Sequence, residues 1–534
     1  MAKTHRPINV KASPYRASGN GTVDDTRAIS AAVSAAARGR QSVYFPDGVY
    51  KITDTVTIPP GIPSLFGTGV LRMALSPAAT PSKLFDLHAS DLVIDGLTFD
   101  GSGSDREAAG GNKYVIYAEG NASARLSNIT VKNCCFRNIL YTDNNPPLTN
   151  LLVAHAVYFT YVDHPVLSLN RLTDISGAAF FLSYTTDSKI VDNVINNTGW
   201  YSIQLQSGNA VGLISGNTIT GAGAPKRMWG GSINLMSDGS RNVGPFQIVN
   251  NYISGYHNYG AVIDIQSVDG VIVSGNVIEA ITSSDMVSFI RVESRGVGAY
   301  QGGSCSDISV TGNILRASET GNQSGIYVDN YSHGISGLGY GSRFIVALNV
   351  LISADVDHCF AAGVWFHGQD WGLADIVVAN NVVSGRGSRI LGGLVGFTSS
   401  DKVPMYGVQV SGNNLSLVGV ADDPGSQTGV FIGSHVDRVS IGQNSVRGFY
   451  YGIRGYTDSG PNLYGLPTNA FQGSASVNLL LSVVPPLNTG FPESGSTGAR
   501  PVAVWAGRPF YDTTISEMLW WNGANWIDSN GSSR

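Results

Sequence analysis

The chain has 534 residues, of which 43% are hydrophobic and 13% are charged, and its formal net charge is −5. Because the net charge is negative and no basic run occurs, the composition excludes a nucleic-acid-binding surface, which needs clustered Lys and Arg. No stretch approaches the roughly 18 consecutive apolar residues of a membrane-spanning helix, so we expect no membrane insertion.

Residues 1–88 are predicted to form an N-terminal cap. The first residues lack the apolar core of a signal peptide, so we expect synthesis in a cytoplasm without Sec-dependent export. Within 24–38, two aspartates precede a segment with Ile29 and Val33 on one face, which predicts an amphipathic helix. Residues 43–52 then read as a strand, a Pro-Asp-Gly turn and a second strand.

From residue 89 to 456 one short pattern recurs. It consists of apolar or β-branched residues, a small residue, Asn, any residue, and then Val, Ile or Leu, as in Ile190-Val191-Asp192-Asn193-Val194-Ile195. The copies follow one another about every 32 residues, a period typical of repeat architectures. The central residues of the copies are Asp95, Asn133, Asn170, Asn193, Asn217, Asn251, Asn276, Asn313, Asn349, Asn381, Asn413 and Asn444.

A strand, an Asn-containing bend and a second strand at this period suit a parallel β-helix, whose coils stack about 4.8 Å apart. We expect each Asn to occupy a left-handed bend and to hydrogen-bond the Asn of the next coil. A leucine-rich repeat and a propeller are excluded because their consensus residues are missing. The predicted fold is therefore all-β: a right-handed single-stranded parallel β-helix of about 11–12 coils, with an N-terminal capping helix and a small C-terminal β module.

The opening segment resembles that of the pectate-lyase-like β-helix superfamily. The likeness rests on Ile8-Asn9-Val10-Lys11, on the Gly-Asn-Gly-Thr-Val-Asp-Asp-Thr run at 19–26, and on the helix and turn that follow. This superfamily includes polysaccharide lyases, glycoside hydrolases and phage tailspikes, and in it the helix plugs the open end of the coil. The resemblance covers the first 60 residues and the repeat region, and it implies the fold more strongly than any one chemistry.

Six successive coils share a second strand, at 203–206, 233–236, 263–266, 290–293, 326–329 and 364–367. Strand side chains alternate, so the second and fourth residue of each segment point out of the coil. We call the two resulting outward columns the ladder. Column 1 is predicted to read Gln204, Asn234, Asp264, Arg291, Tyr327 and Trp365. Column 2 is predicted to read Gln206, Met236, Gln266, Glu293, Asp329 and His367.

The composition of the ladder predicts an oligosaccharide-binding groove. Aromatic rings stack on the apolar faces of sugars, and carboxylates, amides and guanidinium groups hydrogen-bond sugar hydroxyls. The alternative is a decorated but inert face of the coil. Flanking segments add His257, Arg295, Tyr300 and Asp370. The residues expected to bind substrate are Arg291, Tyr327, Trp365, His367, Gln266, Gln204, Gln206, Asn234, Trp229 and Trp371.

Three carboxyl groups of the ladder are candidates for catalysis. Glu293 and Asp329 are neighbours one rung apart, and Asp264 lies diagonally across from Glu293 at roughly 7–8 Å. Glycoside hydrolysis needs two carboxyl groups, about 5–5.5 Å apart for retention or about 6.5–9.5 Å apart for inversion. Crowding raises the pKa of one carboxyl group and keeps it protonated. We expect Glu293 to be the general acid, with Asp329 or Asp264 as nucleophile or base, unless these acids only hydrogen-bond or pair with Arg291.

β-Elimination from a uronic acid is the rival chemistry. It needs a cation beside the substrate carboxylate and a base at the acidic carbon, roles that Arg291, Tyr327 and His367 could fill. The resemblance to calcium-dependent lyases adds a variant in which the three carboxylates hold calcium around Arg291. Outside this variant no cofactor and no metal site are expected. The cysteines also lack the spacing of metal ligands: Cys134, Cys135, Cys305 and Cys359.

Residues 457–500 are rich in Gly, Pro, Ser and Asn and predict a connection to a C-terminal module at 501–534. The module contains Gly507-Arg508-Pro509-Phe510-Tyr511-Asp512-Thr513-Thr514 and then Trp520-Trp521-Asn522-Gly523-Ala524-Asn525-Trp526. Asn-Gly between Trp-bearing strands predicts a hairpin. The stretch resembles the short C-terminal module of phage and prophage tail proteins. Its Trp-rich hairpin is expected to be exposed and to act as a trimer clasp, a carbohydrate-binding tip or a cap for the coil.

These patterns together predict a phage tailspike that binds and depolymerises a bacterial capsule, exopolysaccharide or O-antigen. An endo-acting glycoside hydrolase is preferred, with a polysaccharide lyase or a non-catalytic receptor-binding spike as alternatives. A bacterial adhesin is disfavoured by the missing export signal. The tail-type ending implies synthesis in a host cytoplasm, a place in the virion, action at the bacterial surface, a homotrimer, and attachment to a phage tail or adaptor protein.

Overall fold

The computed structural model describes most of the chain. The described residues are 6–75, 82–101, 112–140, 154–222, 231–237, 242–257, 260–282, 286–295, 305–317, 324–331, 341–353, 360–369, 372–385, 393–399, 404–418, 427–449, 451–455, 463–464, 470–472, 477–481, 493–499, 509–521 and 525–528.

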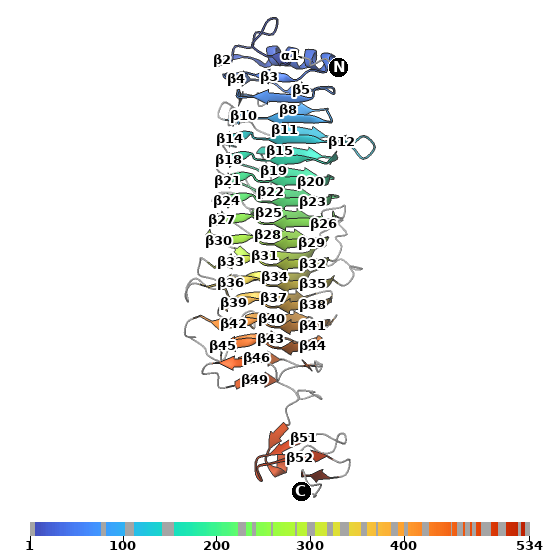
Figure 1. Ribbon diagram of the computed structural model, residues 1–534, viewed down its shortest axis with the longest axis vertical. Coiled ribbons are helices and arrows are strands. Elements are labelled where there is room, and N and C mark those ends of the chain that lie inside the picture. The colour runs from blue at the N-terminus through green and yellow to red at the C-terminus, as the bar shows by residue number, and fades with distance from the viewer. Residues whose placement is uncertain are drawn as a thin grey trace.

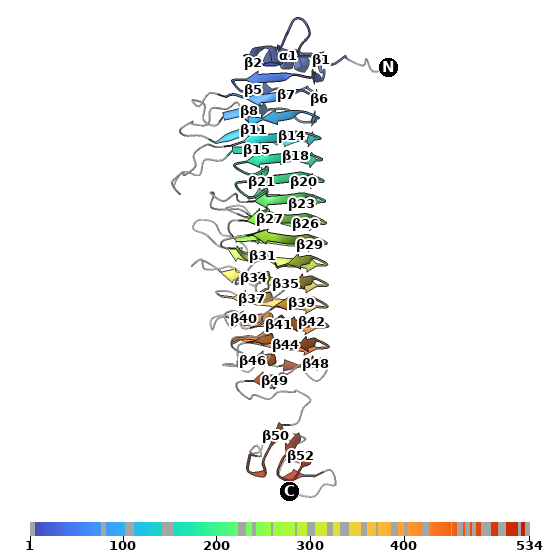
Figure 2. The same cartoon turned by 90° about the vertical axis from the view of Figure 1, so that its left-hand side faces the viewer.

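The described chain winds as a right-handed parallel β-helix, which is capped by one helix and followed by a small β module (Figure 1). A typical coil contributes strands to three parallel sheets, which we call A, B and C. The sheets run along the long axis of the molecule, and Figure 2 shows the same stack from the side. Along the chain a coil passes through sheet C, then A, then B. The predicted fold class is confirmed.

Sheet A contains β1 (Ile8–Asn9), β3 (Val43–Phe45), β6 (Ser64–Gly67), β9 (Leu92–Asp95), β12 (Leu126–Ser127), β13 (Ile129–Lys132), β16 (Val162–Asp163), β17 (Val166–Ser168), β20 (Thr186–Val191), β23 (Ala210–Ser215), β26 (Asn242–Val249), β29 (Val268–Ser274), β32 (Ser306–Thr311), β35 (Gly341–Ala347), β38 (Leu373–Ala379), β41 (Met405–Ser411), β44 (Val436–Gly442) and β47 (Leu463–Tyr464). Sheet B contains β2 (Asn20–Asp24), β4 (Val49–Ile52), β7 (Val70–Met73), β10 (Thr98–Asp100), β14 (Cys135–Ile139), β18 (Arg171–Ile175), β21 (Val194–Thr198), β24 (Thr218–Ala222), β27 (Tyr252–His257), β30 (Val277–Thr282), β33 (Ile314–Arg316), β36 (Val350–Ile352), β39 (Val382–Gly385), β42 (Asn414–Leu417), β45 (Ser445–Arg447) and β48 (Ala470–Gln472). Sheet C contains β5 (Val56–Ile58), β8 (Ser82–Leu87), β11 (Lys113–Glu119), β15 (Ala154–Thr160), β19 (Phe180–Ser183), β22 (Ile203–Gln206), β25 (Ile233–Met236), β28 (Gly260–Gln266), β31 (Met286–Arg295), β34 (Ser324–Tyr331), β37 (Ala362–Gly368), β40 (Val395–Ser399), β43 (Thr428–Ile432), β46 (Tyr451–Gly455) and β49 (Val477–Leu481).

Parallel stacking continues on both sides of residues 89–456. At the N-terminal end β5 pairs with β8, and at the C-terminal end β46 pairs with β49. Within the described residues sheet C has 15 strands, more rungs than the expected 11–12 coils. The outermost coils lack Asn at the repeat position, so the Asn pattern in the sequence does not reveal them.

Helix α1 (Thr26–Gly39) closes the N-terminal end of the coil, at the top of Figure 1. As predicted, its apolar face is buried, with Ile29 and Val33 fully covered. Asp25, expected to cap the helix, makes no side-chain cap bond. Its carboxylate instead accepts two backbone N–H groups of the turn before β2, at 2.5 and 3.0 Å. In the described part of the chain no helix is long and apolar enough to cross a bilayer.

A column of ten buried asparagines runs along the bend between sheets A and B. From Asn193 onward, each Oδ1 accepts both the backbone N–H and the Nδ2–H of the Asn one coil earlier. For Asn276 and Asn313 these bonds are 3.0 and 2.9 Å long. The predicted bonding between coils is therefore confirmed. The members of the asparagine column are Asn170, Asn193, Asn217, Asn251, Asn276, Asn313, Asn349, Asn381, Asn413 and Asn444.

The expected backbone conformation of these asparagines is wrong. The residue before each Asn turns the chain with a positive φ, as Leu348 does at 59°, and this turn aims the Asn side chain along the column. Asn133 also occupies this turning position (φ 52°), so it is not part of the column. Cys134 takes the column position there, and its backbone N–H donates to Asn170 Oδ1 at 3.0 Å.

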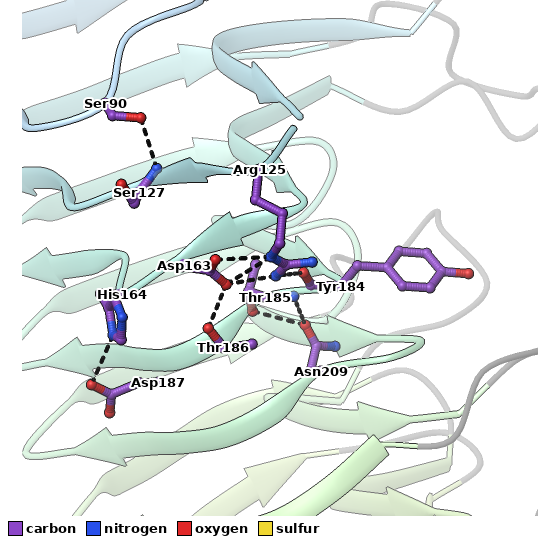
Figure 3. A network of polar contacts seen from close by, with 10 residues as sticks. All are labelled: Ser90, Arg125, Ser127, Asp163, His164, Tyr184, Thr185, Thr186, Asp187 and Asn209. Atoms are coloured by element: carbon purple, nitrogen blue, oxygen red, sulfur yellow. Dashed lines mark hydrogen bonds and ion pairs between the residues drawn. The ribbon is translucent and has the colours of Figure 1, made fainter. Parts of the chain in front are cut away.

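An ion-paired network joins coils at the bend between sheets C and A (Figure 3). Arg125 Nε donates to both carboxylate oxygens of Asp163, at 2.8 and 2.9 Å, and Arg125 Nη2 donates to the Tyr184 carbonyl oxygen. Thr186 Oγ1 donates to the same carboxylate at 2.5 Å. The Arg125 hydrogen bonds hold the pKa of Asp163 below its ordinary value. The network fixes the register of the coils just above the ladder.

The described C-terminal residues form a separate sheet of β50 (Glu493–Gly495), β51 (Pro509–Asp512), β52 (Glu517–Trp521) and β53 (Trp526–Ile527), with a short 3-10 helix at Thr497–Ala499. Trp521 pairs with Trp526 across antiparallel strands, as the predicted hairpin requires. Trp526, however, packs with Phe510 and Leu519 in the module's own core and is only 6% exposed. This side chain therefore stabilises the module and is not a free contact surface.

Candidate functional site

The outward columns lie in the register that the sequence predicted. In column 1, Asp264 pairs with Arg291 and Arg291 with Tyr327 on adjacent strands of sheet C. In column 2, Glu293 pairs with Asp329. Strands β22, β25 and β37 continue both columns in the same register. The inward residues of these strands are fully buried, which fixes the outward direction of the ladder side chains.

Asp264 is the most completely bonded carboxylate of the ladder. Arg291 donates Nε–H to Asp264 Oδ1 at 2.9 Å and Nη2–H to Oδ2 at 2.8 Å. Tyr201 Oη and Gln266 Nε2 donate to the same Oδ2, at 2.9 and 2.7 Å. Asp264 is fully buried, so a substrate would have to displace these partners to reach its oxygens. The arrangement suits a group that positions Arg291.

The ion pair with Asp264 also keeps the Arg291 guanidinium charged. Burial acts to lower the pKa of Arg291, but the carboxylates of Asp264 and Glu293 outweigh burial and raise that pKa above its ordinary value. Arg291 Nη2 lies 3.6 Å from Glu293 Oε2. One permanently charged guanidinium therefore lies between two carboxyl groups.

Glu293 and Asp329 each keep one oxygen without a hydrogen bond. Glu293 Oε2 and Asp329 Oδ1 are both buried, and neither has a hydrogen-bond partner among the described residues. Tyr327 Oη donates to the other Asp329 oxygen at 3.3 Å. Adjacent parallel strands lie about 4.8 Å apart, so these two carboxyl groups face one another across a single rung.

The surroundings of Asp329 favour its protonated form. Burial and the negative charge of Glu293 raise the pKa of the Asp329 carboxyl to about 7. His367 Nδ1 is 3.8 Å from Asp329 Oδ1, but burial lowers the pKa of His367 below its ordinary value, so the imidazole is neutral near pH 7. Burial and the Asp329 carboxylate raise the pKa of the Tyr327 phenol, which therefore remains a hydrogen-bond donor.

The upper rungs of the ladder carry amides. Trp200 Nε1, which the sequence did not single out, donates to Gln204 Oε1 at 2.5 Å, and Gln204 Nε2 lies 3.4 Å from Gln206 Oε1. Asn234 is fully buried, and its Nδ2 donates to the Asp264 carbonyl oxygen at 3.4 Å. Within the described part of the chain, Asn234 Oδ1 and Gln266 Oε1 have no hydrogen-bond partner.

Trp365 closes the lower end of the ladder. Its ring lies over Gly396 and stacks on Phe431, with ring centroids 6.0 Å apart and planes 12° apart. A Cβ on Gly396 would lie 1.8 Å from the Trp365 ring, so only glycine fits under it. Trp365 is 4% exposed. It was expected to stack on sugar, but it instead packs against Phe431 and Tyr327.

Several residues fall outside this description or were missed. Trp229 and Trp371, expected to bind substrate, lie outside the described residues, as do Tyr300 and Asp370 and the side chains of His257 and Arg295. Tyr201 lies 63 residues from Asp264, so no sequence spacing connects them. Gly396 lies one rung beyond the aligned segments and Phe431 lies two rungs beyond them, so extending the alignment by two coils would have revealed both.

Column 1 continues above the ladder as an aromatic stack. Tyr117, Tyr158 and Phe181 are register partners on β11, β15 and β19. Their rings lie nearly parallel, with centroids 5.2 and 4.8 Å apart. The Lys83 ammonium lies 3.7 Å from the Tyr117 ring centroid and covers the far end of the stack. The ring faces contact one another, so these residues chiefly stabilise the coil.

No group of three or more His, Cys, Asp or Glu side chains within the described ranges is arranged to hold a metal ion. The oxygens of Asp264 are occupied by Arg291, Tyr201 and Gln266, which does not suit the expected calcium variant. A resident metal therefore has no candidate ligand set among these residues.

Family comparisons agree with this architecture. A family model described as a right-handed β-helix region matches residues 87–244. A second, described as rhamnogalacturonase A/epimerase, pectate lyase-like, matches residues 8–80, the segment whose resemblance was noted above. A curated glucan 1,3-beta-glucosidase from Cochliobolus carbonum is 51% identical over 45 residues, which is 8% of this chain and 6% of that protein. The chain thus spans about 6% of the curated relative it matches.

Solved structures share the fold. The chain is similar to a mutant tailspike protein of E. coli bacteriophage HK620 in complex with a pentasaccharide. The TM-score is 0.53 at 12% identity, over 89% of this chain and 80% of the other. Tailspike protein 3 of bacteriophage CBA120 matches with a TM-score of 0.43 at 12% identity, over 99% of this chain and 70% of the other.

Proposed function

We propose that this right-handed parallel β-helix protein is a phage tailspike that binds a bacterial surface polysaccharide on its ladder and cleaves it by glycoside hydrolysis. The observation that carries the catalytic part is the pairing of Glu293 with Asp329, two carboxyl groups on adjacent rungs in unlike surroundings. Hydrolysis of a glycosidic bond uses two carboxyl groups with separate roles.

Asp329 is assigned as the general acid. A carboxyl group with a pKa of about 7 is largely protonated at slightly acidic pH and can give its proton to the departing glycosidic oxygen. Tyr327 holds the other Asp329 oxygen by a hydrogen bond. This assignment reverses the expectation from sequence, in which Glu293 was the acid.

Glu293 is assigned as the base or nucleophile. The nearby Arg291 guanidinium stabilises a negative charge on it, and Glu293 Oε2 has no competing hydrogen bond. Asp264 is assigned as a positioning residue, because its contacts fix the guanidinium beside Glu293. Asp264 and Arg291 thus place a positive charge beside Glu293, which distinguishes the base or nucleophile from the general acid Asp329.

Elimination is the less supported reaction. Arg291 is held by Asp264 through two hydrogen bonds and its pKa is raised, so it suits neither a base nor a free cation. The raised pKa of Tyr327 keeps its phenol protonated near pH 7, so no phenolate is available to act as the base. His367, neutral near pH 7, is the remaining described candidate for this step.

The phage context rests on two resemblances. The C-terminal module resembles that of phage tail proteins, and the fold is shared with a tailspike solved with a bound pentasaccharide. On the same grounds we propose that the protein is a homotrimer, that it is attached to a tail or adaptor protein, and that it acts at the bacterial surface. A spike that grips the polysaccharide without cutting it is the alternative.

The direct test is incubation of the protein with purified capsule or O-antigen. Release of reducing ends without the ultraviolet absorbance of an unsaturated uronic acid is expected. Appearance of that absorbance would instead assign the protein to the lyases. Binding of a polysaccharide without any new reducing ends would leave only the non-catalytic spike.

A further inference from the structure

We infer that the ladder accepts sugar units that carry no carboxylate and that present hydroxyl and amide N–H donors to it. This inference rests on the proposed polysaccharide-binding function and narrows the class of substrate. It follows from the hydrogen-bonding groups that the ladder leaves unused and from the distribution of its charges.

The unused hydrogen-bonding groups are acceptors on consecutive rungs. Asn234 Oδ1, Gln266 Oε1, Glu293 Oε2 and Asp329 Oδ1 come from β25, β28, β31 and β34, and all four are buried without a hydrogen-bond partner among the residues that the structure describes. Leaving a buried acceptor unpaired is unfavourable, and four neighbours in this state point to a ligand that supplies donors.

The orientation of the two amides is fixed by their neighbours. Gln266 Nε2 lies 2.7 Å from an Asp264 carboxylate oxygen, and Asn234 Nδ2 lies 3.4 Å from the Asp264 carbonyl oxygen. Both neighbours can only accept, so each amide must turn its nitrogen toward Asp264. The carbonyl oxygens of Gln266 and Asn234 are therefore the atoms left for a ligand.

The charges of the ladder disfavour an anionic sugar. Its described residues include three carboxyl groups and one guanidinium, and Arg291 directs two of its N–H groups at Asp264. A uronate bound at Glu293 and Asp329 would add a third carboxylate to this buried pair of acids. Among the described ladder residues no free cation is available to compensate its charge. Like charges repel strongly where water is excluded. A neutral sugar, an N-acetylated sugar included, avoids this cost and offers donors.

The ladder is accessible near the two acids. The side chains of Arg291, Asp329 and His367 are 16%, 12% and 30% exposed, whereas Asp264 is fully buried. A sugar that approaches from this side meets His367, Arg291 and Asp329, beside the pair of acids. The neutral, donor-rich unit is thus expected at the bond that is cut.

The test uses matched polymers that differ only in charge. A purified uronic-acid-containing capsule that the protein binds or cuts is compared with the same capsule after carbodiimide-mediated carboxyl reduction, which converts each carboxylate to a primary alcohol. Cleavage is followed by reducing ends, and binding is followed separately by affinity electrophoresis. We expect the reduced polymer to be cut, or bound, at least as well as the native polymer. We also expect the sugar at each new reducing end to be neutral.

A uronic acid at the new reducing end, or a tenfold or greater loss of binding on carboxyl reduction, would overturn the inference. Binding without cleavage would remove the hydrolase proposal, while the comparison of native and reduced polymers would still decide the substrate class. Glu293→Gln should weaken the discrimination against native polymer. Glu279→Gln is the matched control, because Glu279 lies on sheet B in an ion pair with Arg316.

Discussion

Glu293 and Asp329 are register partners on the adjacent parallel strands β31 and β34, and each keeps one buried carboxylate oxygen without a hydrogen bond. Two other acids of the described chain accept hydrogen bonds from arginines instead: Asp264 from Arg291 and Asp163 from Arg125. The contrast separates carboxylates that hold the coil together from the pair that is free for chemistry.

Glu293→Gln and Asp329→Asn should each lower the rate of reducing-end release by about 10²–10⁴-fold, because each removes one of the two proton-transfer or nucleophilic groups. Binding of the polysaccharide should persist. Asp307→Asn, in an exposed ion pair with Arg343, is the matched control and should keep wild-type activity. Full activity in either ladder variant would show that the catalytic pair lies elsewhere.

The rate of cleavage should fall as pH rises through about 7. The raised pKa keeps Asp329 protonated below that value, and a general acid is active only while it holds its proton. A pH–rate profile of the wild-type protein measures this limb. The residual activity of Asp329→Asn should not fall as pH rises through about 7, whereas the profile of Asp307→Asn should match the wild type. An unchanged limb in Asp329→Asn would assign the acid to another group.

Asp264→Asn should destabilise the protein by about 3–5 kcal/mol, because Arg291 would lose its closest carboxylate and would keep only the more distant Glu293. Thermal or denaturant unfolding measures the loss. Adding Arg291→Met to Asp264→Asn should recover part of the stability, since the poorly compensated charge is then gone. If Asp264→Asn unfolds like the wild type but no longer cuts, Asp264 is catalytic and not a positioning residue.

Gly396→Ala should displace Trp365, because the added Cβ would lie 1.8 Å from its ring. Overpacking of this kind costs about 1–3 kcal/mol and should lower the Tm, and the Trp fluorescence should change as the ring leaves Phe431. Gly498→Ala is the control, since no atom lies within 4 Å of the Cβ it would add. Equal effects of the two substitutions would contradict the stacking of Trp365 over Gly396.

Asn313→Ala should cost about 2–4 kcal/mol. It removes the acceptor of two Asn276 bonds and leaves a buried backbone N–H unpaired. Asn414→Ala, at an exposed position of β42, should change the free energy of unfolding by under about 0.5 kcal/mol. Hydrogen exchange at Asn276 should accelerate in the first variant only. If the Asn276 amide still exchanged slowly in Asn313→Ala, the asparagine column would not control local unfolding of the coil.

The sequence was sufficient for the fold and for the register of the ladder. Inward residues such as Ile263 and Ile290 must be apolar, so aligning them places Asp264 beside Arg291 and Glu293 beside Asp329. The role of Asp264 could not be predicted, because Tyr201, one of its donors, lies two rungs away in the stack and 63 residues away in sequence. The choice of Asp329 as the acid depends on burial, which no local pattern encodes.

The same limit applies to Trp365 and Trp526. Both were expected on exposed surfaces because large aromatic residues are common in binding sites. Their burial depends on partners from other coils or strands, Phe431 and Gly396 for Trp365 and Phe510 for Trp526. Composition shows where aromatic residues gather, but packing determines whether their faces remain open.

The asparagine column has a consequence for how such a protein can change. Asn170 and Asn193 are 23 residues apart, Asn276 and Asn313 are 37 apart, and the backbone bond is 3.0 Å in both cases. A coil can therefore gain or lose residues in its outer connections while its rung remains in place. Evolution or design can exchange those connections, and Glu293 and Asp329 would keep their mutual spacing.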